Sequence, residues 1–340
     1  MDVDAALHEY GAPTEQASLS QHAPQGGLSL SLAYKLSTPP PMGYPPVHSW
    51  VKATLFSNLH DNTRAIWDAY AGPKIIAMIW NAGYNQPNYA STLMHLKNAI
   101  KEAAPGSNPC IGPPTPKEPP KDPCASPWGF LVADLSPLDA AMLTNQCTWS
   151  CDAISFFAIP YKPDILTFVG TVMNLIGYDS SDSTEVTKLV QDKLCEPGPA
   201  HYLLMDLAPG NDPLVRSTID SLEAHPLELL GVGGVPQCAW NIYATPPFSD
   251  LTYHYCWCKA FSNCTFPTAF NGTGTVHCLA HFSCLGCKSV DHPSGLCPYS
   301  SIQGWKGTPL AAPSRATTAV VNINDATTSF NSLPRGTSRG

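Results

Sequence analysis

The sequence predicts an α+β protein, and three observations lead to that fold class. Short apolar runs with the character of strands alternate with segments of helical periodicity. The 35 prolines gather in a few clusters, which divide the chain into segments. The 13 cysteines, an odd number, include a group near the C-terminus with the spacing of a metal site. We therefore expect a folded α+β centre, a small metal-binding segment and disordered termini.

The N-terminal third is predicted to contain one small folded unit between a disordered segment and a linker. Residues 1–48 are expected to be disordered, because Ser, Gln, Gly and Pro dominate them and no apolar period is sustained. A small α/β unit is predicted for 49–104, where the strand-like run 74–80 (KIIAMIW) precedes an amphipathic helix. Residues 105–126 are predicted to be a linker, because closely spaced prolines cannot continue a helix or a sheet ladder.

Residues 127–246 are predicted to form a second domain with alternating strands and helices. The expected elements are strands at 128–135, 154–161, 165–176 and 238–244, and helices at 136–145 and 184–195. Their order, strand, helix, strand, strand, helix, strand, is that of a ferredoxin-like sandwich, the architecture of RNA-recognition motifs (RRM-like). Four basic against fourteen acidic residues give this domain a net charge of −10, which repels phosphate. We therefore expect self-association or a protein partner for it.

The aromatic and cysteine-rich segment 247–305 contains one specific motif. Residues 284–297 match C-x2-C-x4-H-x4-C. Two thiolates on a tight turn, followed by an imidazole and a third thiolate from a short return loop, can close a tetrahedron around Zn²⁺. A closed tetrahedron leaves no position for substrate, so the predicted metal is structural. The predicted ligands of this zinc knuckle are Cys284, Cys287, His292 and Cys297.

Other cysteines and histidines nearby leave alternatives open. Cys278 and His281 stand just upstream of the motif and could replace a ligand or lie beside the site. Cys256, Cys258 and Cys264 could belong to a second metal centre, although no complementary pair has a familiar spacing. Small buried residues are the favoured interpretation of these three.

The knuckle spacing resembles that of retroviral and retrotransposon Gag nucleocapsid proteins. The longer run from Cys284 to Trp305 is similar to Gag-like CCHC-knuckle proteins of mushroom-forming fungi, in which a strand-rich domain and a Trp-Asn-Ile-Tyr segment, here at 240–243, precede the knuckle. The resemblance implies a retroelement-derived protein that binds single-stranded nucleic acid, RNA rather than DNA.

The predicted nucleic-acid contacts depart from the usual knuckle pattern. Nucleocapsid knuckles commonly carry an aromatic residue after the first Cys, where this chain has Leu285. Stacking on an aromatic side chain contributes roughly 1–3 kcal/mol per base, so another aromatic residue would have to replace it. The predicted contacts are Leu285, Lys288, Tyr299, Trp305 and Lys306, with a weakly basic disordered tail at 306–340.

Catalytic motifs are absent from the sequence, which predicts a protein that is not an enzyme. There is no G-x-S-x-G, G-x-x-x-x-G-K-[ST] or H-E-x-x-H, and no Asp-Thr-Gly or Asp-Ser-Gly triplet. The apolar runs fall short of the roughly 20 residues that cross a bilayer, and no signal-peptide pattern is present. We therefore expect an intracellular protein of the cytoplasm or nucleus, without membrane contact.

Two functions follow from these observations. The leading prediction is a zinc-dependent, Gag-like protein that binds single-stranded nucleic acid. The alternative is a protein-interaction adaptor or assembly protein, in which the zinc knuckle is purely structural.

Overall fold

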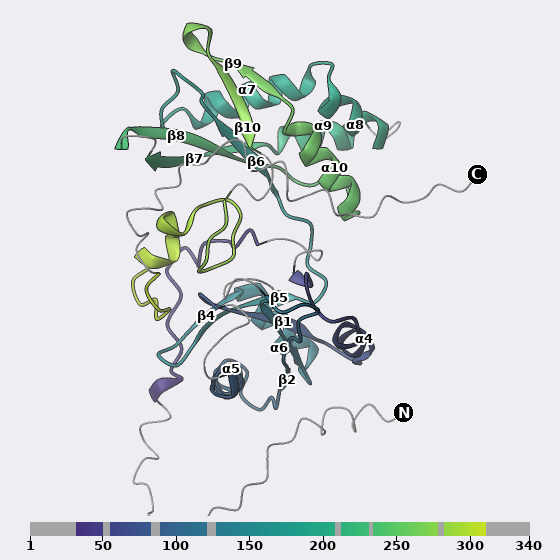
Figure 1. The fold of residues 1–340 in the computed structure, drawn as a ribbon, viewed down its shortest axis with the longest axis vertical. Coiled ribbons are helices and arrows are strands. Elements are labelled where there is room, and N and C mark those ends of the chain that lie inside the picture. The colour runs from purple at the N-terminus through teal and green to yellow at the C-terminus, as the bar shows by residue number, and fades with distance from the viewer. Residues whose placement is uncertain are drawn as a thin grey trace, which may run out of the picture.

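Two five-stranded antiparallel sheets form the framework of the protein (Figure 1). The computed structural model describes residues 32–49, 55–82, 89–120, 127–207, 212–230, 234–277 and 282–310. Strands and helices are mixed in both halves of the chain, which confirms the α+β class. Within the described ranges, no helix combines the length and the apolar character needed to cross a membrane.

The first sheet has the strand order β2-β3-β1-β5-β4, with every neighbouring pair antiparallel. Its central strand carries the run IIAMI and is buried along its whole length. Alternate residues of this strand point to opposite faces, so Ile75 and Ala77 pack against the helices while Ile76 and Met78 face the other way. The elements of this first unit are α4 (Asp61–Ala69), β1 (Ile75–Ile79), α5 (Tyr89–Ala103), β2 (Cys110–Gly112), β3 (Gly129–Ala133), α6 (Pro137–Gln146), β4 (Thr148–Ser150) and β5 (Ser155–Pro160).

The second sheet has the strand order β7-β8-β6-β10-β9, again antiparallel throughout. This is the order of the first sheet with each strand number raised by five, so the same topology occurs twice in one chain. The three helices α7 to α9 stand in the place of α5, and α10 stands in the place of α6. The elements of this second unit are β6 (Phe168–Met173), α7 (Ser183–Cys195), α8 (Pro199–Leu207), α9 (Asp212–Asp220), β7 (Glu223–Leu230), β8 (Pro236–Tyr243), α10 (Leu251–Phe261), β9 (Thr265–Pro267) and β10 (Thr273–His277).

Local sequence signals begin the equivalent helices α6 and α10. Ser136 caps α6 by accepting a hydrogen bond from the backbone N–H of Asp139 at 3.1 Å, and Pro137 occupies the first turn. Asp250 caps α10 by accepting from the N–H groups of Thr252 and Tyr253. The predicted helix 136–145 corresponds to α6, whereas no helix was predicted over α10.

The single ferredoxin-like sheet predicted for 127–246 does not form. The expected strands and helices are present, but β3 and β5 pair with β1 in the first sheet, whereas β6 and β8 lie in the second. The chain crosses between the sheets at 161–167, in the middle of the predicted domain. The predicted unit 49–104 is likewise not separate, because β1 is buried on both faces and requires β3 and β5 beside it. Part of the predicted linker 105–126 forms edge strand β2.

Residues 34–49, named the strap here, differ from the disorder predicted for 1–48. Tyr34 is buried against α5, with its hydroxyl 2.9 Å from Nδ1 of His95. Farther along, the ring of Tyr44 stacks on Tyr299. The strap therefore runs from the first unit to the C-terminal segment. Residues 1–31 and 311–340 lie outside the described part of the chain.

The C-terminal segment 282–310 lies between the two sheets (Figure 1). The faces of the two sheets that are turned toward each other, opposite α5 and α6 in the first unit and opposite α7 in the second, are named the inner faces here. On the first inner face, the segment packs in one apolar cluster with Trp80 and Phe157. On the second, it receives hydrogen bonds from Asn241 and Tyr243 of β8. The knuckle thus contacts both units, although it follows the second one in the sequence.

Candidate metal centre

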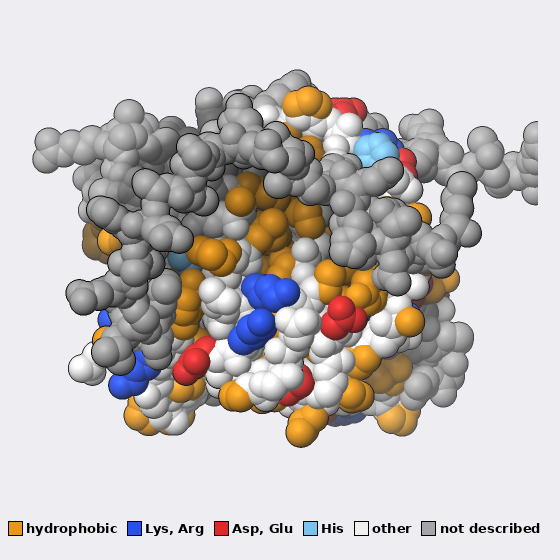
Figure 2. All heavy atoms as spheres, turned by 90° about the horizontal axis from the view of Figure 1, so that it is seen from below, with side chains coloured by type: hydrophobic (Ala, Val, Ile, Leu, Met, Phe, Trp, Pro, Cys, Tyr) orange, Lys and Arg blue, Asp and Glu red, His pale blue; other side chains and the backbone are white. Residues whose placement is uncertain are grey.

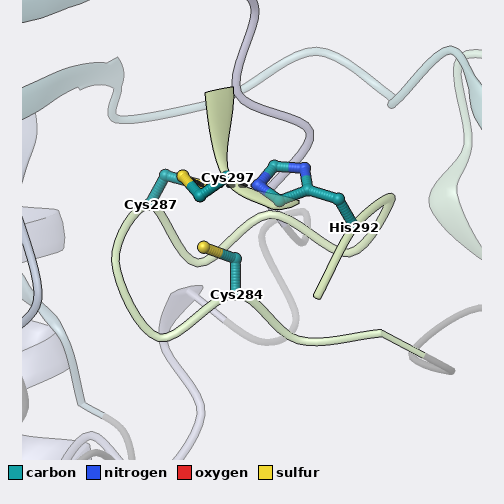
Figure 3. Close-up of side chains that lie close together, drawn as sticks. All are labelled: Cys284, Cys287, His292 and Cys297. Atoms are coloured by element: carbon teal, nitrogen blue, oxygen red, sulfur yellow. Dashed lines mark hydrogen bonds between the residues drawn. The ribbon is translucent and has the colours of Figure 1, made fainter. Parts of the chain in front are cut away.

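The four predicted ligands come together in the structure, with their side chains converging on one point (Figure 3). Their ligand atoms all lie within 4.8 Å of one another, and all four residues are buried. Tetrahedral zinc with Zn–S about 2.3 Å and Zn–N about 2.0 Å separates two sulfurs by about 3.8 Å and sulfur from nitrogen by about 3.5 Å. Sγ of Cys287 is 3.8 Å from Sγ of Cys297 and 3.4 Å from Nε2 of His292. The site therefore has the dimensions of a tetrahedral centre that could hold a metal ion.

A tight turn between the first two cysteines presents their sulfurs. The N–H of Lys288 donates to the carbonyl of Cys284 at 2.9 Å, and Lys288 adopts a left-handed conformation with φ of 62°. The turn is held on the end of β1, because the N–H of Asn81 donates to the carbonyl of Gly286 at 2.9 Å. At Gly286 only glycine fits, since an added Cβ would lie 2.5 Å from the ring of Trp80.

The ring of His292 is oriented by the residue before it. Nδ1 of His292 lies 2.6 Å from Oδ1 of Asp291, which leaves Nε2 directed at the cysteine sulfurs. Ser289 donates to the same carboxylate oxygen at 2.6 Å. A ligating histidine that donates its other ring N–H to a carboxylate is the usual arrangement in metal sites, because it fixes the ring and makes it a better ligand.

The close contacts among these polar side chains shift the pKa values of Asp291, His292 and Cys284. Burial opposes ionisation of Asp291, but hydrogen bonds from His292 and Ser289 outweigh it and lower the pKa of Asp291 to about 2. Burial also acts to lower the pKa of His292, but Asp291 and the neighbouring thiols outweigh it and raise that pKa to about 11. Hydrogen bonds from Cys287 and Cys297 lower the pKa of Cys284. A metal ion that binds here displaces the protons on Nε2 and on the thiols.

The strap encloses the knuckle from a third side. The N–H of His48 donates to Oγ of Ser289 at 3.0 Å, and the N–H of Val290 donates to the carbonyl of His48 at 3.2 Å. The hydroxyl of Tyr299 donates to the carbonyl of Pro45 at 2.7 Å. The knuckle therefore contacts the strap as well as the inner faces of both sheets.

The predicted nucleic-acid contacts are mostly engaged within the protein. Tyr299 is only 1% exposed and packs among other aromatic rings, with Trp305 4.9 Å from it between ring centroids. Lys288 is 7% exposed, and its Nζ donates to the carbonyl of Leu285. Lys306 pairs with Asp152, while Leu285 is 46% exposed. Of the five, Leu285 and Lys306 present the most surface to a partner.

The alternative ligands do not join the centre in the described part of the chain. Cys278 and His281 lie outside the described residues. Cys256 is exposed, whereas Cys258 is buried with its Sγ 3.4 Å from Nε2 of His254. Cys264 is half-buried. Among the described residues, the four knuckle ligands are the one group of three or more that could hold a metal.

Sequence reasoning missed the residues that surround the ligands. Asp291 is not among the predicted site residues, and the Trp-Asn-Ile-Tyr segment enters the sequence analysis only as part of a resemblance. In the structure, Asn241 and Tyr243 of that segment both bond to Asp291. An acidic residue directly before a ligating histidine was the one local signal that could have identified this contact.

Comparison with known proteins identifies neither a family nor a function for this chain. No family model matches the chain, and neither a curated protein nor a solved structure is significantly similar to it.

Proposed function

We propose that this protein is a non-catalytic adaptor or assembly protein, in which a structural zinc ion fastens two ferredoxin-like units to each other. In each unit the order is strand, helix or helices, two strands, helix, two strands, with antiparallel neighbours, which fits a ferredoxin-like unit with one added strand. The observation that supports the proposal is the position of the four ligands, buried between the two inner faces.

Zinc is the metal that suits this donor set best. Three thiolates and one imidazole in a tetrahedral arrangement favour Zn²⁺ over the hard cations Mg²⁺ and Ca²⁺, which prefer oxygen ligands. All four positions of a tetrahedron are supplied by the protein, and Cys284 and Cys287 are fully buried. Such a closed site contributes folding free energy and leaves no position for a reacting water or substrate.

A protein partner is favoured over nucleic acid by the covered inner faces. RNA-recognition motifs stack bases on aromatic side chains of the exposed sheet face. Here the knuckle covers that face of the first sheet, and Tyr299 is buried beneath it.

The surface charge also favours a protein partner. The chain has a net charge of −8. In the coloured part of the face shown in Figure 2, a few Lys and Arg side chains lie among acidic and hydrophobic ones. The affinity of a protein for nucleic acid rises with the number of phosphates that Lys and Arg side chains contact, so the sparse basic side chains on this face favour a protein partner.

The proposal is tested on the purified full-length protein. Elemental analysis should find one equivalent of zinc, and the zinc-loaded protein should leave a fluorescent single-stranded RNA oligomer unbound at low salt. A chelator should lower the unfolding temperature of both units together, which hydrogen exchange followed separately in β1 and β8 would report. Tight RNA binding that is lost on Lys288→Ala would instead favour the nucleic-acid function, and the absence of bound metal would contradict both.

A further inference from the structure

We propose that Tyr243, a residue of the second unit, is a positioning residue for the metal centre and sets its affinity through Asp291. The inference rests on the proposed metal function and names a residue outside the knuckle that controls it. Tyr243 is the last residue of β8 and lies 49 positions before His292 in the sequence.

The two residues are linked through one carboxylate. The hydroxyl of Tyr243 donates to Oδ2 of Asp291 at 2.8 Å. The other oxygen, Oδ1, lies 2.6 Å from Nδ1 of His292. Because each oxygen is used by a different partner, the plane of the carboxylate is defined by Tyr243 on one side and by His292 on the other. The direction of Nε2, which must point at the metal, follows from that plane.

The anchor of this link is a central strand rather than a loop. β8 lies between β7 and β6 in the second sheet. From the same strand, Nδ2 of Asn241 donates to the backbone carbonyl of Asp291 at 2.7 Å. Asn241 is itself held by Thr171 of β6, whose hydroxyl donates to Oδ1 of Asn241 at 2.8 Å. Both the backbone and the side chain of Asp291 are thus fixed to the second sheet, whereas the cysteine ligands pack on the first.

Metal binding and docking of the second unit are therefore coupled. When the second unit is docked, Tyr243 holds Asp291 and the histidine ring is ready to bind. When the second unit is not docked, Asp291 loses its hydrogen bond from Tyr243. The bound metal must then fix the orientation of the His292 ring at a cost in binding free energy. Coupling of this kind is reciprocal, so the bound metal strengthens the docking of the second unit by the same factor.

The test is Tyr243→Phe in the full-length protein, with Tyr161→Phe as the matched control. Tyr161 also donates a hydrogen bond to a carboxylate, Oδ1 of Asp68 at 2.7 Å, but this bond lies on the first unit near α4. Both variants lose the same kind of bond. Zinc affinity is measured by competition with a chromophoric chelator, and Co²⁺ is used as a spectroscopic probe of tetrahedral coordination.

We expect Tyr243→Phe to weaken zinc binding about tenfold or more, the usual effect of removing a group that supports a ligand, and to alter the Co²⁺ absorption bands. Tyr161→Phe should leave both unchanged. Asp291→Asn should weaken binding further, because the direct partner of His292 is changed. Wild-type affinity in Tyr243→Phe, or equal losses in the two tyrosine variants, would overturn the inference. If the wild-type protein itself bound no metal, the proposed function would fail first, so the two failures are distinguishable.

Discussion

At the residue scale, the four knuckle side chains that could hold a metal are all buried. Cys284 and Cys287 are fully buried, and Cys297 is 5% exposed. Three thiols and an imidazole in contact crowd polar groups into an apolar cluster that includes Trp80 and Phe157. A bound cation would satisfy all four groups at once, and structural zinc sites contribute folding free energy in this way.

Substitution of Cys287 removes one of the four proposed ligands. Cys287→Ser should abolish stoichiometric zinc binding and lower the free energy of unfolding by about 4 kcal/mol when free zinc stands about 1,000-fold above the dissociation constant. Denaturant unfolding with and without zinc measures it. Cys195→Ser is the control, because Cys195 is an exposed cysteine on α7. Equal zinc content in the two variants would contradict a role for Cys287 as a ligand.

The free energy of unfolding should also depend on pH through His254, a buried residue outside the knuckle. His254 on α10 is only 2% exposed, and burial lowers its pKa from 6.5 to about 4. Between these values the unfolded chain binds a proton that the folded protein does not. The contribution of His254 is therefore complete above pH 6.5 and is lost as the pH falls toward 4, by about 3 kcal/mol in total.

Urea unfolding at several pH values checks the effect of His254. His254→Gln should lose less stability than the wild type between pH 7 and pH 5, whatever its stability at pH 7. His225→Gln, which changes an exposed histidine on β7, should keep the wild-type dependence. An unchanged pH dependence in His254→Gln would show that this side chain is not the titrating group.

At the scale of elements, the knuckle turn packs closely against the end of β1. The ring of Trp80 is held by its own hydrogen bond to the carbonyl of Thr308 at 2.8 Å and by the neighbouring rings. It has no room to move away from the turn. The backbone of Gly286 approaches this ring so closely that no side chain can be placed between them.

Gly286→Ala should therefore destabilise the docked knuckle by about 1–3 kcal/mol, the usual cost of overpacking. Gly295→Ala is the matched control within the same knuckle, because an added Cβ there meets nothing within 4 Å. Thermal unfolding of the two zinc-loaded variants, with tryptophan fluorescence as the readout, measures the difference. Equal stability of the two would mean that the turn does not rest on Trp80 in solution.

At the scale of the whole molecule, the chain repeats one topology and then returns to join the two copies. The first half supplies the strap and the first sheet, and the second half supplies the second sheet and the knuckle. The connection between the sheets is exposed at Lys162 and Asp164. Because strap and knuckle lie in different halves and touch each other, the halves should hold together without that connection.

A specific protease site inserted between Lys162 and Asp164 tests this arrangement. After cleavage, the zinc-loaded halves should elute together in size-exclusion chromatography, because the knuckle of one half is docked on the sheet of the other. Removal of zinc should separate them, and the same cleavage in Cys287→Ser should give separate halves from the start. Separation in the presence of bound zinc would contradict the fastening role.

How much could be predicted from the sequence follows from how local each signal is. The spacing of Cys284, Cys287, His292 and Cys297 lies within a short segment, and the predicted ligands do cluster. The predicted strand at 74–80 and the predicted helix at 136–145 also match β1 and α6, because strand periodicity and helix capping depend on neighbouring residues. Several strands and helices and the clustering of the four knuckle side chains therefore follow from local sequence.

Only the tertiary structure decided which strands share a sheet and what covers the inner faces. The segment 127–246 carries the strand and helix order of one domain, yet its strands divide between two sheets. Nothing local distinguishes the two outcomes, because an antiparallel pairing depends on residues far along the chain, such as Ile76 and Leu131. In the same way Tyr299, an aromatic residue suited to stacking on a base, is instead buried against the first sheet by contacts with residues more than 140 positions away. Burial is a property of the packed whole, and the four Cys and His side chains lie between the two units only because the chain folds back over both.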